Sequence, residues 1–162
     1  MNFKSFKLEQ NDMSARRYVY EGHKTDNGVH LEHYIRTEEW DDKKLENVEC
    51  RSIVRAIDGD IKLFHRLCDL FDNCGVGGWA DFHGRNLYAL DGAGMNFDVV
   101  LEDGTKLNAE GNNEFPSNYS KLVQGLRDLI TTEKISSTKF TDGTYEITLP
   151  ESIWARLFPD VW

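Results

Sequence analysis

The segment from Phe97 to Ala109 alternates apolar and polar residues on both sides of the sequence Glu-Asp-Gly at 102–104. Alternation with a period of two is typical of a half-buried β-strand, and Asp-Gly is a turn dipeptide. A two-residue loop would place apolar side chains opposite polar ones, whereas a three-residue loop pairs Val99 with Leu107. The segment therefore predicts an antiparallel hairpin with a type I turn, a bulge and a left-handed Gly104.

The N-terminal third of the chain also reads as β-structure. A run of β-forming residues at 18–20 and an alternating segment at 29–36 flank the turn sequence Asp-Asn-Gly at 26–28, which predicts a second hairpin. The charged residues 38–44 read as a connector, and a further short strand is expected at 51–56.

Two amphipathic helices are expected, at about 59–73 and 116–130. In the first, apolar residues occupy one half of the helical wheel, Asp58 and Asp60 are N-cap candidates, and Gly75 is a C-terminal stop. Pro116 is placed to start the second helix. A last hairpin is expected around 142–143, and Pro150 would open a short C-terminal helix.

These elements predict a single α+β domain over residues 1–162: a mainly antiparallel sheet of hairpins, with the two main helices on one face and a short C-terminal helix. A chain of 162 residues is long enough to bury a core. Its 12% aromatic content argues against disorder, and no apolar run approaches the roughly 18 residues of a membrane span. An odd number of widely spaced cysteines without a secretory signal predicts free thiols in the cytoplasm.

The formal charge of −9 disfavours direct contact with nucleic acid and favours a basic protein partner. Residues 38–49 hold six acidic residues against two lysines, and residues 91–114 hold six against one. Such clusters are either ordinary solvated surface or a docking surface. The residues expected to contact a partner are Glu38, Glu39, Asp41, Asp42, Glu102, Asp103, Glu110 and Glu114.

The most reactive-looking stretch is Trp-Ala-Asp-Phe-His-Gly at 79–84, followed by Asp91. Asp81 and His83 fit the roles of orienting group and general base, or they would hold a metal ion with Asp91 or Glu114. In the alternative interpretation, Asp81 and His83 are turn residues of a loop that its aromatic residues anchor in the core.

Two other patterns look like a metal site and a dinucleotide-binding motif, but their positions in the expected elements do not suit those functions. His30 and His33 point to opposite faces of a strand and cannot share a metal ion. Residues 75–80 fit G-x-G-x-x-A but follow a helix instead of a strand, so no cofactor is expected.

Residues 79–130 resemble a family of uncharacterised small proteins of Gram-positive, often gut-dwelling, bacteria. The similarity is carried by residues 79–84, 90–92, 95–97, 101–107, 109–113, 115–116 and Tyr119. The family pattern reads W-x-G-F, L-D-G-x-x-F and D-G-x-x-I-x-A-x-G-x-N-x-F-P-x-x-Y, and Asp81 stands where that pattern has Gly. The resemblance implies a hairpin-plus-helix module and implies no activity.

Three functions remain open from the sequence, and the third is a scaffold or housekeeping protein that dimerises through its sheet edge or its terminal helix. The leading hypothesis is an acidic protein-binding module, such as an inhibitor that occupies the basic groove of a nucleic-acid-handling enzyme, as phage counter-defence proteins do. The alternative is a small hydrolase or nuclease, with or without a metal ion, that uses Asp81, His83 and Asp91.

Overall fold

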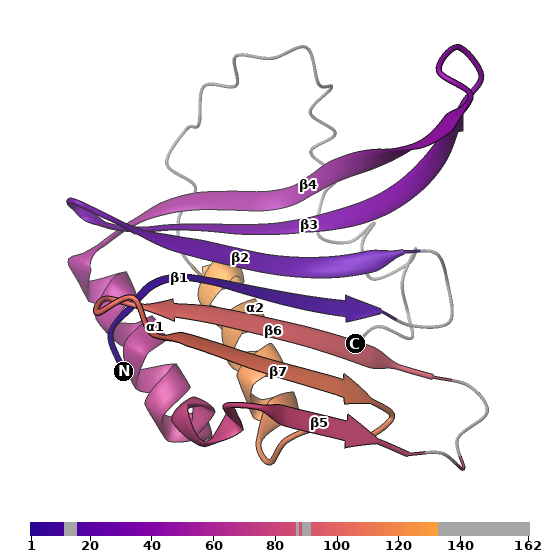
Figure 1. The fold of residues 1–162 in the computed structure, drawn as a ribbon. Coiled ribbons are helices and arrows are strands. Elements are labelled where there is room, and N and C mark those ends of the chain that lie inside the picture. The colour runs from indigo at the N-terminus through magenta and orange to yellow at the C-terminus, as the bar shows by residue number, and fades with distance from the viewer. Residues whose placement is uncertain (12–15, 87, 89–91, 133–162) are drawn as a thin grey trace.

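The computed structural model describes residues 1–11, 16–86, 88 and 92–132. Within them, seven strands form one sheet in the order β4-β3-β2-β1-β6-β7-β5 (Figure 1), which confirms the predicted α+β class. The strands are β1 (Phe3–Asn11), β2 (Arg17–Thr25), β3 (Gly28–Asp41), β4 (Glu46–Asp60), β5 (Phe82–Arg85), β6 (Gly94–Leu101) and β7 (Lys106–Asn112).

The β6–β7 hairpin has the predicted register. Val99 pairs with Leu107, the Leu101 N–H donates to the Thr105 carbonyl at 2.8 Å, and Gly104 is left-handed with φ 88°. Neighbouring strands in the sheet run antiparallel except for β5 and β7, which are parallel. Since β5 follows a helix and not a tight turn, its direction is free of the hairpin constraint.

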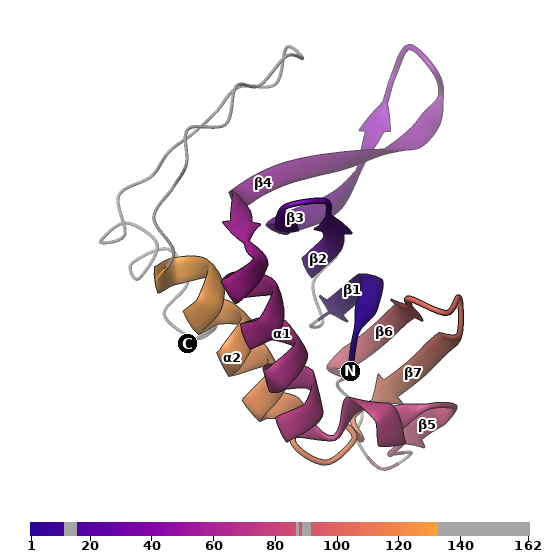
Figure 2. The same cartoon turned by 90° about the vertical axis from the view of Figure 1, so that its left-hand side faces the viewer.

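Helix α1 (Ile61–Cys74) begins at Asp60, whose carboxylate accepts the N–H groups of Lys62 and Leu63, and it ends at Gly75 with φ 71°. Helix α2 (Tyr119–Thr132) begins three residues after Pro116, because Asn118 is left-handed with φ 63° and cannot continue a helix toward the proline. Both helices cover the same face of the sheet (Figure 2), as predicted. Neither is long and apolar enough to cross a membrane, and these are the α-helices of the described part.

The core between helices and sheet is built around aromatic rings. The Phe3 ring lies 5.1 Å from Phe64 and 5.2 Å from Phe71, and Trp79 packs on Phe97 at 5.7 Å. Trp79 belongs to the 3-10 helix η1 (Val76–Trp79) and is 5% exposed, so it anchors the loop before β5 as the alternative interpretation expected.

Strands β3 and β4 are longer than the sequence indicated. The segment 38–44, interpreted as a connector, continues β3 to Asp41 and then forms the turn to β4, so that interpretation is wrong. We call residues 37–50 the arm: it is the end of the β3–β4 hairpin and extends beyond the rest of the sheet (Figures 1 and 2). The predicted hairpin near 142–143 and the C-terminal helix lie outside the described residues.

Candidate functional site

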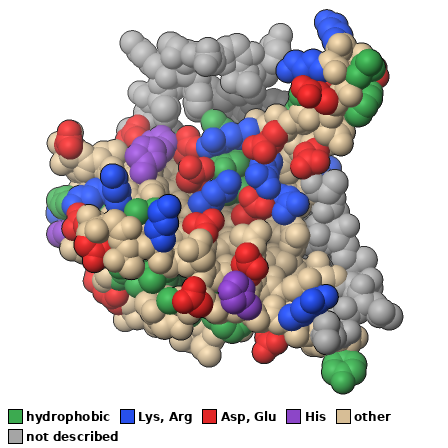
Figure 3. Space-filling model, in the orientation of Figure 1, with side chains coloured by type: hydrophobic (Ala, Val, Ile, Leu, Met, Phe, Trp, Pro, Cys, Tyr) green, Lys and Arg blue, Asp and Glu red, His purple; other side chains and the backbone are tan. Residues whose placement is uncertain are grey.

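The face of the sheet opposite the helices is polar, and we call it the open face. Because side chains alternate along a strand, burial of Phe6 and Leu8 against the helices turns Lys7 and Glu9 outward on β1. Figure 3 views this face and shows acidic, basic and histidine side chains interspersed over it. The open face is therefore mixed in charge, although the whole chain is acidic.

Strand register arranges the open face into rows that cross the sheet. The middle row comprises Val19, Glu9, Asn96, Glu110 and His83. The end row comprises Arg17, Asn11, Gly94, Asn112 and Arg85. Adjacent strands lie about 4.8 Å apart, so neighbours within a row are in reach of one another.

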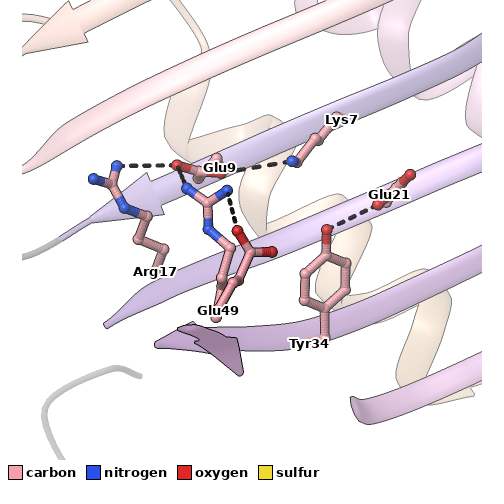
Figure 4. A network of polar contacts seen from close by, with 7 residues as sticks. Lys7, Glu9, Arg17, Glu21, Tyr34 and Glu49 are labelled. Carbon is pink, nitrogen blue, oxygen red and sulfur yellow. Dashed lines mark hydrogen bonds and ion pairs between the residues drawn. The ribbon is translucent and has the colours of Figure 1, made fainter. Parts of the chain in front are cut away.

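Glu9 is the buried acidic residue of the described chain, with 7% of its surface exposed. Its Oε1 accepts from Arg17 Nη1 at 3.0 Å and from Arg36 Nη2 at 2.8 Å, and Lys7 Nζ lies 3.8 Å from its Oε2 (Figure 4). Arg36 also reaches Glu49 on β4 at 3.4 Å. The network joins four strands and offsets the cost of burying a carboxylate.

Over β2, β3 and β4, side chains of the open face pack against one another and cover the sheet. The Tyr34 hydroxyl donates to Glu21 Oε2 at 2.8 Å, and the Arg51 guanidinium lies 3.7 Å from the centre of the Tyr34 ring. Burial, followed by the bond to Glu21, raises the pKa of Tyr34. Val19 is fully buried beneath this layer.

Over β1, β6 and β7 the same face is hollowed. A cavity of about 680 Å³ lies around Gly94, and a second of about 230 Å³ lies beside it. Three residues of the middle row line both cavities: Glu9, Asn96 and Glu110. We call the two cavities together the trough.

His83 lies at the edge of the trough. Its Nδ1 is 3.5 Å from Glu110 Oε2, with both side chains about two-thirds exposed at 65% and 66%. Asp81 precedes β5 in a left-handed conformation with φ 58°, and its N–H donates to the Asn108 carbonyl. In the described part of the chain, the carboxylate beside His83 is therefore that of Glu110, and Asp91 lies outside the described residues.

The remaining histidines and cysteines have structural surroundings. His30 lies on the open face between Asp58 and Glu32, while His33 faces the helices, which confirms that the two point apart. All three cysteines are free thiols. The described residues contain no group of three His, Cys, Asp or Glu side chains placed to hold a metal ion.

The acidic residues expected around β7 are distributed among separate local contacts. Glu102 pairs with Lys24, and Asp103 accepts the Thr105 N–H at 2.8 Å, which lowers the pKa of Asp103. Beyond β7, Glu114 accepts the Arg85 N–H at 3.1 Å. Glu102 and Asp103 lie at the opposite end of β7 from Glu114, so the four predicted contact residues of this cluster do not form one surface.

The first acidic cluster, in contrast, lies on one element, the arm. Its six carboxylates flank, in the sequence, two exposed apolar side chains, Trp40 at 58% and Leu45 at 73%. Asp41 caps the turn by accepting the N–H groups of Lys43 and Lys44. Partial burial and the Glu39 carboxylate raise the pKa of the Cys50 thiol, so this cysteine is not an activated nucleophile.

Sequence reasoning missed the Glu9 network and the trough. Glu9, Arg17 and Arg36 lie on three different strands, and only the pairing of those strands makes them neighbours. The available signal was the polar set Lys7, Glu9 and Asn11 at every second position of β1.

Comparison with protein-family models, with curated proteins and with solved structures gave no match. The function is therefore inferred from the residues and their geometry.

Proposed function

We propose that this chain is a non-enzymatic protein-binding module whose arm engages the partner. The observation that carries the proposal is an exposed apolar pair, Trp40 and Leu45, among six carboxylates on a projecting hairpin. With two lysines, the arm has a formal charge of 2 − 6 = −4. The complementary surface is a cationic groove with an apolar recess.

The turn of the arm exposes Leu45 at a cost to its own stability. Leu45 has φ 57°, a left-handed conformation that costs a non-glycine residue roughly 1–2 kcal/mol. Tryptophan is among the residues that contribute most to binding energy at interfaces. A strained, exposed leucine near an exposed tryptophan is therefore better explained by contact with another molecule than by folding.

The proposed partner is a protein that handles nucleic acid. Such proteins collect Lys and Arg along a groove to bind phosphates, and carboxylates on a narrow β-ribbon present the same sign of charge. The arm would occupy this groove and compete with the nucleic acid. The chain would then act as an inhibitor.

The test is retention of lysate proteins by the immobilised chain, followed by elution with duplex DNA. The variants are Glu38→Lys/Asp42→Lys on the arm and Trp40→Ala. The matched control is Asp69→Lys/Asp128→Lys, which makes the same charge change on α1 and α2. Ionic strength is then raised to about 1 M, where the Debye length is about 3 Å.

The proposal expects a basic partner that wild type and the control retain, that both arm variants lose, and that duplex DNA or high salt releases. Retention by the arm variants at wild-type level would overturn it. So would a partner that DNA does not displace, because the groove would then lie elsewhere.

A second candidate function is hydrolysis, favoured by one observation: His83 meets Glu110 at the edge of the trough. Glu110 would orient the imidazole, which would act as a general base. His83→Ala would then abolish turnover of a phosphodiester or ester substrate at an unchanged melting temperature. Turnover that survives this substitution contradicts the role.

A further inference from the structure

The trough has a simple structural origin. In the end row, Gly94 lies between Asn11 on β1 and Asn112 on β7, and it contributes no side chain to the open face. The Asn11 side chain folds down over Gly94, where a Cβ would meet Asn11 Oδ1 at 2.1 Å, and only a glycine leaves room for this arrangement. The resulting 680 Å³ cavity falls within the range of small-molecule sites, and its smaller neighbour extends it along the sheet.

The trough is lined by groups that both donate and accept hydrogen bonds. Each of β1, β6 and β7 contributes an asparagine, namely Asn11, Asn96 and Asn112. A carboxamide offers two donor hydrogens and one acceptor oxygen, and a hydroxyl group can satisfy both kinds. Most small-molecule sites are mainly apolar, so this lining selects a hydrophilic ligand.

The formal charges around the 680 Å³ cavity cancel. Glu9 and Glu110 supply two negative charges, and Arg17 and Arg85 supply two positive ones, so 2 − 2 = 0 with neutral His83. Glu9 is held by Arg17 and Arg36. A phosphate or a polyamine would meet no net charge of opposite sign, whereas an uncharged ligand incurs no such penalty.

Not every lining group can be reached by a ligand. Asn11 Oδ1 is buried, without a partner among the described residues, and is turned toward the backbone of Gly94, where a Cβ would meet it at 2.1 Å. The lining side chains that are exposed include those of Asn96, Glu110 and Asn112. These carboxylate and carboxamide groups are the ones that a ligand in the cavity would contact.

We propose that the trough binds a neutral polyhydroxylated ligand of the carbohydrate class. Vicinal hydroxyl groups donate to the Glu110 carboxylate and accept from the amide groups of Asn96 and Asn112. The described lining residues include no Phe, Tyr or Trp ring on which a sugar could stack, so binding rests on hydrogen bonds and we expect a Kd of about 1 mM. The trough lies across the sheet from the arm, and the proposal is independent of the partner.

The test is a titration followed by amide chemical shifts, with glucose, galactose, mannose, N-acetylglucosamine, maltose and cellobiose as probes. Inorganic phosphate and tetra-alanine are the competing classes. Gly94→Val is designed to fill the cavity. The new Cβ would meet Asn11 Oδ1 at 2.1 Å, so the flexible Asn11 side chain has to turn away from the backbone of residue 94. Asn96→Ala, on an exposed position, removes one amide without touching the core. Lys106→Gln, at the other end of β7, is the control.

The proposal expects saturable shifts with at least one sugar, centred on Asn11, Asn96, Glu110 and Asn112. Gly94→Val and Asn96→Ala should each weaken binding about tenfold or more, and Lys106→Gln should leave it unchanged. The absence of saturable shifts with every sugar would overturn the proposal. So would binding of phosphate or peptide alone, or wild-type affinity in a folded Asn96→Ala variant.

Discussion

Glu9 is a carboxylate held in the surface of a sheet rather than on its edge. Two guanidinium groups from neighbouring strands bond to the same oxygen, at 3.0 and 2.8 Å, and this double contact replaces the water that a carboxylate at 7% exposure has lost. Removal of the Glu9 carboxylate would leave the two guanidinium groups without their counter-charge.

Glu9→Gln should lower the free energy of unfolding by about 2 kcal/mol, because Arg17 and Arg36 lose their shared counter-charge. Urea denaturation measures the change. Lys7→Gln is the control and should stay within about 0.5 kcal/mol, since the Lys7 ammonium is 3.8 Å away and partly exposed. Equal losses in the two variants would contradict this account.

His33, on the side of the sheet that faces the helices, should make the stability of the fold depend on pH. Its ring stacks on Tyr20 with centroids 4.3 Å apart and planes 5° apart. Burial, aided by the nearby Arg127 charge, lowers the pKa of His33 to about 4. The ordinary pKa is about 6.5 in the unfolded chain.

Because the folded pKa is the lower one, the stability contributed by neutral His33 is complete above pH 6.5. It is lost progressively as the pH falls from 6.5 to about 4. His33→Phe keeps a ring on Tyr20 and does not titrate. Between about pH 7 and pH 4.5, wild type should lose about 2 kcal/mol more than the variant in urea denaturation. Parallel pH profiles would show that His33 does not titrate as stated.

At the scale of elements, the sequence predicted the hairpin register that depends only on neighbouring residues. Alternation together with Asp103-Gly104 was enough to place Val99 opposite Leu107, because a register slip would turn every apolar side chain outward. The arm was not predictable in this way. Its carboxylates disfavour strands, and only pairing between β3 and β4 holds the segment extended.

The N-terminal cap of α1 can be tested directly. Asp60→Ala should cost about 1 kcal/mol, because the Lys62 and Leu63 N–H groups lose the acceptor that lies 2.9 and 3.0 Å away. Asp69→Ala, on the exposed side of the same helix, should change stability by less than about 0.5 kcal/mol. Thermal or urea unfolding distinguishes them, and an equal cost at both positions would exclude capping as the cause.

The arm should be removable without loss of the fold. Replacing residues 38–49 by Asn-Gly joins Thr37 to its partner Cys50 through a two-residue turn. Since the arm contributes no residue to the core, the free energy of unfolding should change by less than about 1 kcal/mol. The shortened chain should also lose the partner. A loss of stability comparable to that of a core substitution would show that the arm supports the fold.

At the scale of the whole molecule, β1 is the centre of the sheet. It pairs with β2 on one side and with β6 on the other, and its apolar side chains lie in the aromatic core. This order could not be read from the sequence, because the pairing of β1 with β6 joins segments that no local pattern connects. For the same reason the trough, which spans β1, β6 and β7, was not predicted, although several of its residues were singled out.

Hydrogen exchange should reflect this arrangement. Backbone amides of β1 should exchange only through global unfolding, whereas amides of the arm should exchange through local opening and several orders of magnitude faster. Exchange followed by mass spectrometry resolves the two segments. Similar protection in the arm and in β1 would contradict a central role for β1.

The central place of β1 has a consequence for synthesis on the ribosome. Its first edge is covered as soon as β2 emerges, but the strand that covers its second edge begins at Gly94, 94 − 11 = 83 residues after β1 ends. At a synthesis rate of about 5–20 residues per second, that edge and the phenylalanines beside it stay uncovered for roughly 4–17 s. During this interval the nascent chain offers a strand that other chains can join, and a chaperone that shields apolar segments should raise its yield.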